Sequence, residues 1–187
     1  MITDNRDIDI TNETELTCTG NTLVLMVGLP RSGKSTWALQ QGAPVVSPDA
    51  FRLCFTGRRW WGPIEHEVWA ATRTSIRALF WAGNKTVILD ATNLSRAQRE
   101  MFRPSPDVQW RRGAVIIEAR PEVCRQRAID TGQEYLLEVI DWMAAHTDNI
   151  EPEEDIEIIG TIDSNPVPPM PDVAFVDLSQ PEIYVGI

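Results

Sequence analysis

The sequence predicts an α/β fold, in which a parallel β-sheet is covered by helices on both faces. Two observations support this prediction. Short, continuously apolar segments alternate along the chain with longer amphipathic ones, and they lack the regular polar positions of a strand with one wet face. Strands buried on both faces need such unbroken runs. The clearest of them are 22–28, 85–90 and 113–119.

The remaining strands are shorter or more polar. APVVS at 43–47 is expected to form a short strand, and DIEIIGTI at 155–162 alternates as a strand does. A Pro-rich spacer follows, and residues 172–178 could form a last strand. Residues 1–20 are polar and predict a loose arm or a short edge strand.

Each expected helix has a recognisable signal at one of its ends or along one face. Gly42 and Gly83 follow two of them, Ser95 caps the start of another, and Pro121 occupies a first turn. Asp49 stands near the start of a fifth. The expected helices are 32–41, 48–55, 64–83, 94–102, 121–129 and 134–146, and residues 56–63 are expected to form a loop.

Charge divides the 187-residue chain into three parts. The formal net charge of −10 is the sum of −4 in an acidic N-terminal arm (1–20), +4 in a central core (21–147) and −10 in a Pro-containing C-terminal extension (148–187). That extension could add the last strand. A mildly basic core remains compatible with a polyanionic partner, which the overall charge alone would argue against.

Composition excludes several classes of protein. No apolar run approaches the roughly 18 residues that span a bilayer, and the N-terminus lacks the pattern of a secretory signal. The three cysteines (Cys18, Cys54 and Cys124) suit neither a disulfide framework nor a zinc site. A cytoplasmic protein without a membrane partner is expected, in the host cytoplasm if the gene belongs to a phage. The sequence does not indicate the oligomeric state.

The strongest motif is GLPRSGKST, which follows the strand at 22–28 and opens a helix. It matches the G-x-x-x-x-G-K-S phosphate-binding loop, the P-loop. Its backbone N–H groups and the helix N-terminus would hold phosphate, Lys34 would supply a charge for the β- and γ-phosphates, and Ser35 a hydroxyl for Mg²⁺. The expected nucleotide-binding residues in it are Gly28, Arg31, Ser32, Gly33, Lys34, Ser35 and Thr36.

A second motif, VVSPDAFR, ends the next strand and therefore lies at the same sheet edge. Asp49 could take the proton of a phosphoryl-acceptor hydroxyl, and Arg52 could hold an acidic acceptor. Alternatively, Asp49 only caps the start of the helix, and Arg52 follows it three residues later by chance. In a third motif, TVILDATN, Asp90 ends a strand and would help position Mg²⁺, while Asn93 lies in the loop above the sheet.

Arginines and tryptophans supply two further groups. Arg120, Arg125 and Arg127 could form a helical lid that stabilises the transferring phosphate, or a solvated helix face. In the loop GRRWWG, Arg58 and Arg59 could meet phosphates, and Trp60 and Trp61 could stack on a base or anchor the loop on the core. The first reading favours a nucleic-acid or nucleotide acceptor.

These motifs, in this order over about residues 22–145, resemble the phage-type polynucleotide 5′-hydroxyl kinase and related small P-loop kinases. The resemblance implies a P-loop NTPase-type sheet with an Arg-bearing helical lid. It implies Asp49 as the general base, Arg52 as the acceptor clamp, Arg127 as a lid arginine that with Arg125 reaches the nucleotide, and Asp90 as an ordering residue. Thr131 stands where the family carries a second lid arginine.

The sequence therefore predicts an ATP- and Mg²⁺-dependent kinase of a polynucleotide 5′-hydroxyl. The guanine-reading segment of a GTPase and the Asp-x-Asp-x-Thr signature of a fused 3′-phosphatase are both absent from the chain. A kinase of small molecules, of nucleosides or of a modified DNA base is an alternative. A nucleotide-binding protein with degraded catalysis is another, which Thr131 suggests. Preference for DNA or RNA is not indicated.

Overall fold

The structure is a computed structural model that describes residues 9–10, 14–15 and 20–166, with side chains from residue 20 onward. Two short strands, β1 (Asp9–Ile10) and β2 (Thr14–Glu15), pair antiparallel before the main fold begins. Most of the expected acidic arm and the strand expected at 172–178 lie outside the described residues.

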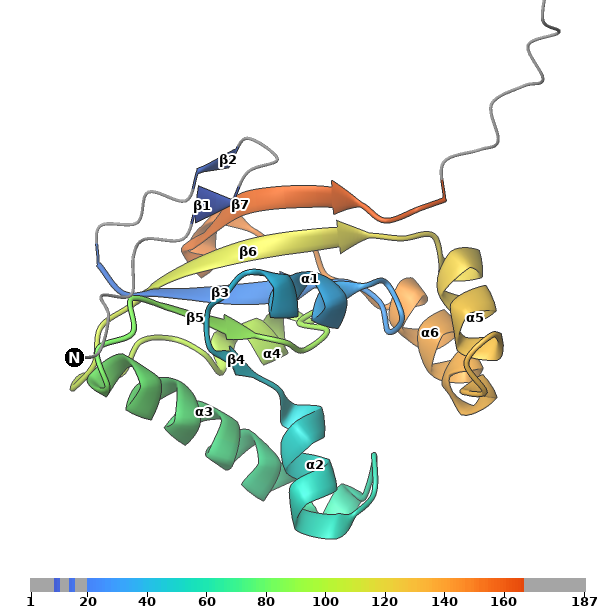
Figure 1. Ribbon diagram of the computed structural model, residues 1–187, viewed down its shortest axis with the longest axis horizontal. Coiled ribbons are helices and arrows are strands. Elements are labelled where there is room, and N and C mark those ends of the chain that lie inside the picture. Colours follow the sequence, from blue (N-terminus) through green and yellow to red (C-terminus); the bar gives the residue numbers. More distant parts are fainter. Residues whose placement is uncertain (1–8, 11–13, 16–19, 167–187) are drawn as a thin grey trace, which may run out of the picture.

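The main sheet has five parallel strands in the order β4-β5-β3-β6-β7 (Figure 1). Their bounds are β3 (Thr22–Val27), β4 (Val45–Val46), β5 (Thr86–Leu89), β6 (Arg111–Glu118) and β7 (Ile156–Asp163). Because every strand runs the same way, all carboxyl ends meet at one edge of the sheet. This confirms the predicted α/β fold and the P-loop NTPase-type sheet.

The central strand β3 explains why the apolar runs are unbroken. All six of its residues are buried, and it pairs with β5 on one side and β6 on the other. Leu23 and Leu25 pack with Ile76 and Phe80 of the long helix on one face. Val24 and Met26 point to the opposite face, where they cluster with Ala38 of the first helix. Successive residues therefore serve two cores.

The helices connect the strands and cover both faces. They are α1 (Lys34–Gln40), α2 (Pro48–Thr56), α3 (Glu65–Trp81), α4 (Arg96–Glu100), α5 (Pro121–Ile129) and α6 (Leu137–Ala145), with short 3₁₀ turns at Gly62–Ile64, Glu134–Leu136 and Pro152–Glu154. In Figure 1, α2 and the start of α3 form a projection below the sheet, and α5 and α6 lie beyond the carboxyl edge. None of the helices in the described part of the chain could cross a membrane.

Four helices, α1, α3, α4 and α6, begin one to three residues later than predicted, and for α1 and α4 the local reason is clear. Helix α1 begins at Lys34 instead of residue 32, because Gly33 has φ +108° and still belongs to the loop. Helix α4 begins at Arg96, because Ser95 is extended and caps it: its hydroxyl accepts from the backbone of Gln98 at 3.2 Å. The capping signal of Ser95 is thereby confirmed.

A buried ion pair joins α4 to the segment that leads into β7. Arg99 and Glu154 are both fully buried and make two hydrogen bonds, each of 2.8 Å. Arg112 of β6 adds contacts from its guanidinium to the carbonyls of Arg99 and Glu154. This network fixes the 148–155 segment against the core and so sets the position of the edge strand.

Removing one member of this pair should strongly destabilise the fold. Glu154→Ala leaves the Arg99 charge buried and uncompensated, and we expect it to lower the free energy of unfolding by about 3–5 kcal/mol. Urea denaturation followed by circular dichroism measures this loss. The exposed neighbour Glu153 offers the control, because Glu153→Ala should change stability by less than about 0.5 kcal/mol. Equal losses in the two variants would contradict a structural role for the pair.

Candidate active site

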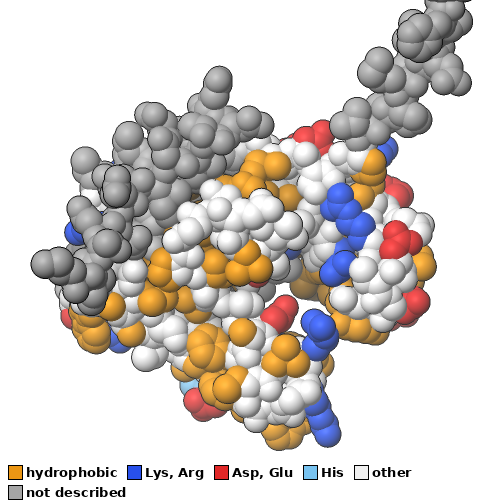
Figure 2. Space-filling view, in the orientation of Figure 1, with side chains coloured by type: hydrophobic (Ala, Val, Ile, Leu, Met, Phe, Trp, Pro, Cys, Tyr) orange, Lys and Arg blue, Asp and Glu red, His pale blue; other side chains and the backbone are white. Residues whose placement is uncertain are grey.

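The predicted motifs meet at the carboxyl edge of the sheet. The loop before α1, the start of α2 and the loop after β5 follow three neighbouring strands, and α5 follows the fourth. Figure 2 shows a hollow between the projection and the rest of the molecule, with acidic and basic side chains at its rim. This is where ligands bind in open α/β sheets.

The backbone of the P-loop depends on its glycines. Gly28 has φ +151°, and a Cβ there would lie 2.6 Å from the carbonyl oxygen of Ile117 in the adjacent strand. Its N–H donates to the carbonyl of Thr92 at 3.1 Å, which ties the P-loop to the loop after β5. Arg31 also has a positive φ, of 66°. A larger residue at position 28 would force apart β6 and the loop that should hold phosphate.

Lys34 is held inside this loop. Its side chain is buried, and Nζ donates to the Leu29 carbonyl at 2.6 Å. Burial lowers the pKa of Lys34 to about 8, against the opposing influence of Asp90 and, more weakly, of Asp49. Lys34, Asp49 and Asp90 are therefore close enough to affect one another, although they come from three different segments.

The lowered pKa predicts that triphosphate binding takes up a proton at alkaline pH. At pH 9 the free protein holds Lys34 mostly uncharged, whereas a bound polyanion favours the ammonium and raises this pKa. ATP binding at pH 9 should then take up most of one proton, and binding at pH 7 almost none. Calorimetric titrations in two buffers of different ionisation enthalpy measure the uptake. Equal uptake at both pH values would show that the triphosphate does not meet Lys34.

Ser35 and Asp90 are suitable ligands for Mg²⁺. Ser35 is exposed on the first turn of α1, and its hydroxyl bonds to the half-buried Asp90 carboxylate. Burial raises the pKa of Asp90, while the Ser35 hydroxyl and Lys34 oppose the rise. No group of three or more acidic, His or Cys side chains that could hold a metal occurs among the residues described. One hydroxyl and one carboxylate still fit Mg²⁺, which takes its other ligands from phosphates and water.

The acceptor side contains a carboxylate, an arginine and a second carboxylate. Arg52 donates to Asp49 at 2.5 Å, and its other edge makes two hydrogen bonds to Glu65, of 2.7 and 2.6 Å. Arg52 and Glu65 are 12% and 17% exposed, whereas Asp49 is 70% exposed. The bonds to Glu65 raise the pKa of Arg52. The reactive candidate, Asp49, thus faces solvent, and the pair beneath holds it.

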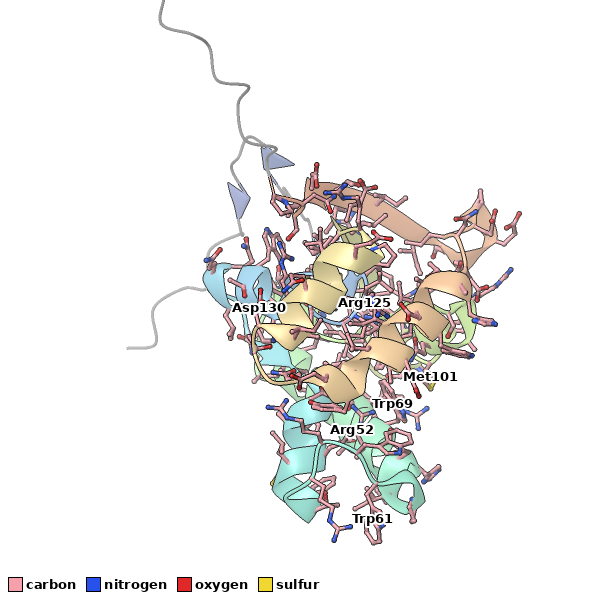
Figure 3. All side chains as sticks on the ribbon, turned by 90° about the vertical axis from the view of Figure 1, so that its right-hand side faces the viewer. Arg52, Trp61, Trp69, Met101, Arg125 and Asp130 are labelled. Carbon is pink, nitrogen blue, oxygen red and sulfur yellow. The ribbon has the colours of Figure 1, made fainter. Side chains whose placement is uncertain are left out.

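Two tryptophans flank Arg52. Its guanidinium carbon lies 5.8 Å from the ring centroid of Trp60 and 5.7 Å from that of Trp69. Figure 3 shows Arg52 and Trp69 close together. Trp60 is 66% exposed, and Trp61, Arg58 and Arg59 are exposed as well. The loop is therefore not anchored on the core by its two tryptophans, and an exposed aromatic face lies beside Arg52.

The arginines of α5 make contacts within the protein. Arg127 donates to the carbonyls of Arg31 and Ser32, at 3.2 and 3.1 Å, and to Ser164 after β7. It thereby holds the P-loop against the end of the edge strand. Arg125 pairs with Asp141 of α6. The Thr131 hydroxyl bonds to the backbone of its own helix and adds no charge.

Asn93 is fully buried within the loop after β5. Its Nδ2 donates to the carbonyl of Met26 at 2.8 Å, and its φ is +46°. The Arg99 guanidinium in turn donates to the Asn93 carbonyl at 3.1 Å. Asn93 thus shapes the loop that carries Asp90 and connects it to β3.

Glu65 is the site residue that the sequence pattern missed. It lies in the first turn of a long helix, where acidic residues are common for reasons of helix stability alone. Glu65 lies 13 residues after Arg52, on the helix α3 that packs against α2. Only this position could have suggested that Glu65 pairs with Arg52.

Glu65→Gln should weaken the hold on Arg52 and so misplace Asp49. The amide keeps the shape but loses the charge and one acceptor oxygen, and we expect kcat to fall about tenfold with little change in the KM for ATP. Steady-state phosphoryl transfer measures both constants. Glu67→Gln, on the exposed side of the same turn, is the control. A change in the KM for ATP alone would contradict a positioning role on the acceptor side.

Known proteins resemble this chain in sequence or in fold. Residues 23–148 match the AAA_33 family, an AAA domain. No curated protein matches the chain. A candidate kinase from Chloroflexus aurantiacus has a similar structure, with a TM-score of 0.58 and 17% identity over 79% of this chain and 90% of that one. A sugar kinase from Janibacter sp. HTCC2649 gives 0.53 and 20%, over 78% and 86%.

A chain of the Pnkp1/Rnl/Hen1 complex shares a higher identity. It matches with a TM-score of 0.50 and 26% identity, over 59% of this chain and 40% of that one. The protein therefore spans less than half the length of that relative, and the likeness concerns only the shared part.

Proposed function

The chain belongs to the AAA_33 family, a P-loop kinase family of AAA domains, and from this premise we propose that it transfers the γ-phosphoryl group of ATP to a polynucleotide 5′-hydroxyl. The observation that carries the proposal is the approach of Asp49, held by Arg52, to Lys34 and Asp90 at one sheet edge. In this proposal the P-loop binds the phosphate donor, and the solvent-facing Asp49 acts as the base in the same hollow.

The donor half follows from the P-loop. Its backbone N–H groups and Lys34 bind the phosphates, and Ser35 and Asp90 would hold Mg²⁺, which neutralises charge on the phosphates when bound. Arg127 supports the loop through the carbonyls of Arg31 and Ser32. Closure of the nucleotide site over the donor would bring the remaining N–H donors of Arg125 and Arg127 to phosphate.

In the acceptor half, Asp49 accepts the proton of the acceptor hydroxyl as its oxygen attacks the γ-phosphorus in line. The bond from that phosphorus to the β,γ-bridging oxygen breaks, and ADP leaves with the electron pair. Arg52 keeps the carboxylate oriented and offers a cation to an acceptor phosphate. Holding both groups before the reaction reduces the entropic cost of the encounter.

Three observations favour a polynucleotide over a small acceptor. Trp60 is exposed beside the clamp, Arg58 and Arg59 precede it, and bases stack on such aromatic faces. The core carries net positive charge although the chain is acidic. The Pnkp1/Rnl/Hen1 relative belongs to an RNA repair complex, and a polynucleotide acceptor is in keeping with that likeness.

Labelled ATP tests this assignment against its alternatives. The protein is incubated with [γ-³²P]ATP and Mg²⁺ together with a 5′-hydroxyl oligonucleotide, the same oligonucleotide with a 5′-phosphate, a nucleoside or a sugar. Label on the 5′-hydroxyl oligonucleotide alone is the expected result. Label on both oligonucleotides would place the acceptor hydroxyl on a base, and label on the nucleoside or sugar alone would overturn the polynucleotide. ATP binding without transfer would identify a protein with degraded catalysis.

A further inference from the structure

A second concave surface lies along α3. We name it the α3 groove: it runs between α3 and residues 101–110 and has a volume of about 330 Å³. Three arginines line it, Arg73 and Arg77 from α3 and Arg103 from the facing segment. Its floor includes Phe102 and Trp110, which are buried. None of its lining residues belongs to the site described above.

A row of side chains on α3 connects the site to this groove. Glu65, Trp69, Arg73, Arg77 and Trp81 follow one another at intervals of four residues. Residues four apart form a ridge inclined to the helix axis, and each interval advances about 6 Å along the axis and turns about 40° around it. At the site end, Trp69 lies under Arg52, and its ring contacts Phe102 of the groove floor at 6.1 Å between centroids.

The groove arginines retain free hydrogen-bond donors. Among the described residues, Arg73 is exposed and has no hydrogen-bond or ion-pair partner. Arg77 reaches Asp107 through Nη2 only, and its Nε is buried without an acceptor. Arg103 reaches Glu100 through Nε. Each guanidinium carries five N–H donors, so all three can still meet phosphate oxygens.

The row ends in an exposed aromatic face. Trp81 is 63% exposed, and the guanidinium carbon of Arg77 lies 5.1 Å from its ring centroid. Trp60 presents the corresponding exposed face at the site end. Two arginines between two tryptophans along this ridge suit a single-stranded polynucleotide, whose bases stack while its phosphates meet cations. A sugar or free nucleoside at Asp49 is too short to extend along this row.

We infer that the α3 groove binds the strand that follows the 5′-terminal nucleotide of the acceptor, with its phosphates on Arg73, Arg77 and Arg103 and a base on Trp81. This inference rests on the proposed polynucleotide acceptor and adds the path of the strand. It explains why an acidic protein places unpaired arginine donors on the same helix that carries Glu65.

Acceptor length tests the inference. We compare kcat/KM for a 5′-hydroxyl 20-mer with kcat/KM for a nucleoside 3′-phosphate, and take the ratio. Arg73→Ala removes one cation without breaking an internal contact, and the ratio should fall about tenfold, the effect of one charge-assisted hydrogen bond. Arg73→Lys should restore most of it, because a phosphate contact needs charge more than geometry. Circular dichroism verifies that each variant is folded.

A binding measurement separates failure of the groove from failure of the kinase reaction. Fluorescence anisotropy of a labelled 5′-hydroxyl oligonucleotide needs no transfer, and the slope of log K against log salt should fall by about 0.7 in Arg73→Ala. Lys85→Ala removes an equally exposed cation outside the groove and should change neither the slope nor the length ratio. If Arg73→Ala and Lys85→Ala behave alike in both measurements, the groove does not carry the strand. Absence of transfer by the wild type, with the anisotropy difference intact, would refute the reaction and retain the groove.

Discussion

Asp49→Asn is expected to lower kcat for phosphoryl transfer by about 10²–10⁴-fold while the protein still binds ATP. The amide is nearly isosteric with the carboxylate but cannot accept a proton from the attacking hydroxyl, and general base catalysis contributes a factor of this size. Asp49 is 70% exposed, so the substitution should not disturb folding. Transfer to a 5′-hydroxyl oligonucleotide and ATP binding by calorimetry are the two measurements.

Asp49→Glu provides the comparison. It restores a carboxylate at a slightly different reach and should recover part of the activity lost in Asp49→Asn. Full turnover by Asp49→Asn would remove Asp49 from the mechanism. Loss of ATP binding in parallel with transfer would instead assign Asp49 to the donor side, near Lys34.

The second large effect is expected at Lys34. Lys34→Ala removes the buried ammonium that the P-loop holds through Leu29, and kcat/KM for ATP should fall about 10²–10³-fold, as when one electrostatic donor to a transition state is lost. The chain has only two lysines, so Lys85→Ala is the natural control and should leave donor use unchanged. Unchanged ATP use by Lys34→Ala would contradict the phosphate cradle.

Much of the sheet could be predicted because its signal is local. A strand with two buried faces must be apolar throughout, and the runs at 22–28, 85–90 and 113–119 are observed as β3, β5 and β6 within about two residues. The order β4-β5-β3-β6-β7 could not be predicted in the same way, since it depends on pairings between distant segments. Nor could the Arg99–Glu154 pair, whose members are 55 residues apart.

In the candidate site, too, local signals were predictable and contacts between distant segments were not. Lys34, Ser35 and Asp90 were predictable because motif spacing and strand ends bring them to one edge, and Ser35 does bond to Asp90. The contacts of long side chains were not predictable. An arginine can reach phosphate, carboxylate or carbonyl with similar ease, and Arg127 lies on P-loop carbonyls while Arg125 pairs with Asp141. Their roles toward the nucleotide remain predictions.

The exposure of Trp60 is a further feature that the sequence could not predict. A tryptophan in a loop is equally compatible with a buried anchor and an exposed stacking face, and only the three-dimensional placement beside Arg52 separates the two. The motif VVSPDAFR marked only Asp49 and Arg52 for the proposed acceptor side. The structure adds Glu65, which holds Arg52, and the exposed ring of Trp60 beside them.

The central claim is that Asp49 serves a 5′-hydroxyl delivered by a polynucleotide. A crystal structure with a non-hydrolysable ATP analogue, Mg²⁺ and a 5′-hydroxyl oligonucleotide measures this most directly. The terminal 5′-oxygen is expected within about 2.6–3.2 Å of an Asp49 carboxylate oxygen, on the side that faces the γ-phosphate, with the first base against Trp60. A 5′-oxygen beyond hydrogen-bond reach of Asp49, with the analogue seated in the P-loop, would contradict it.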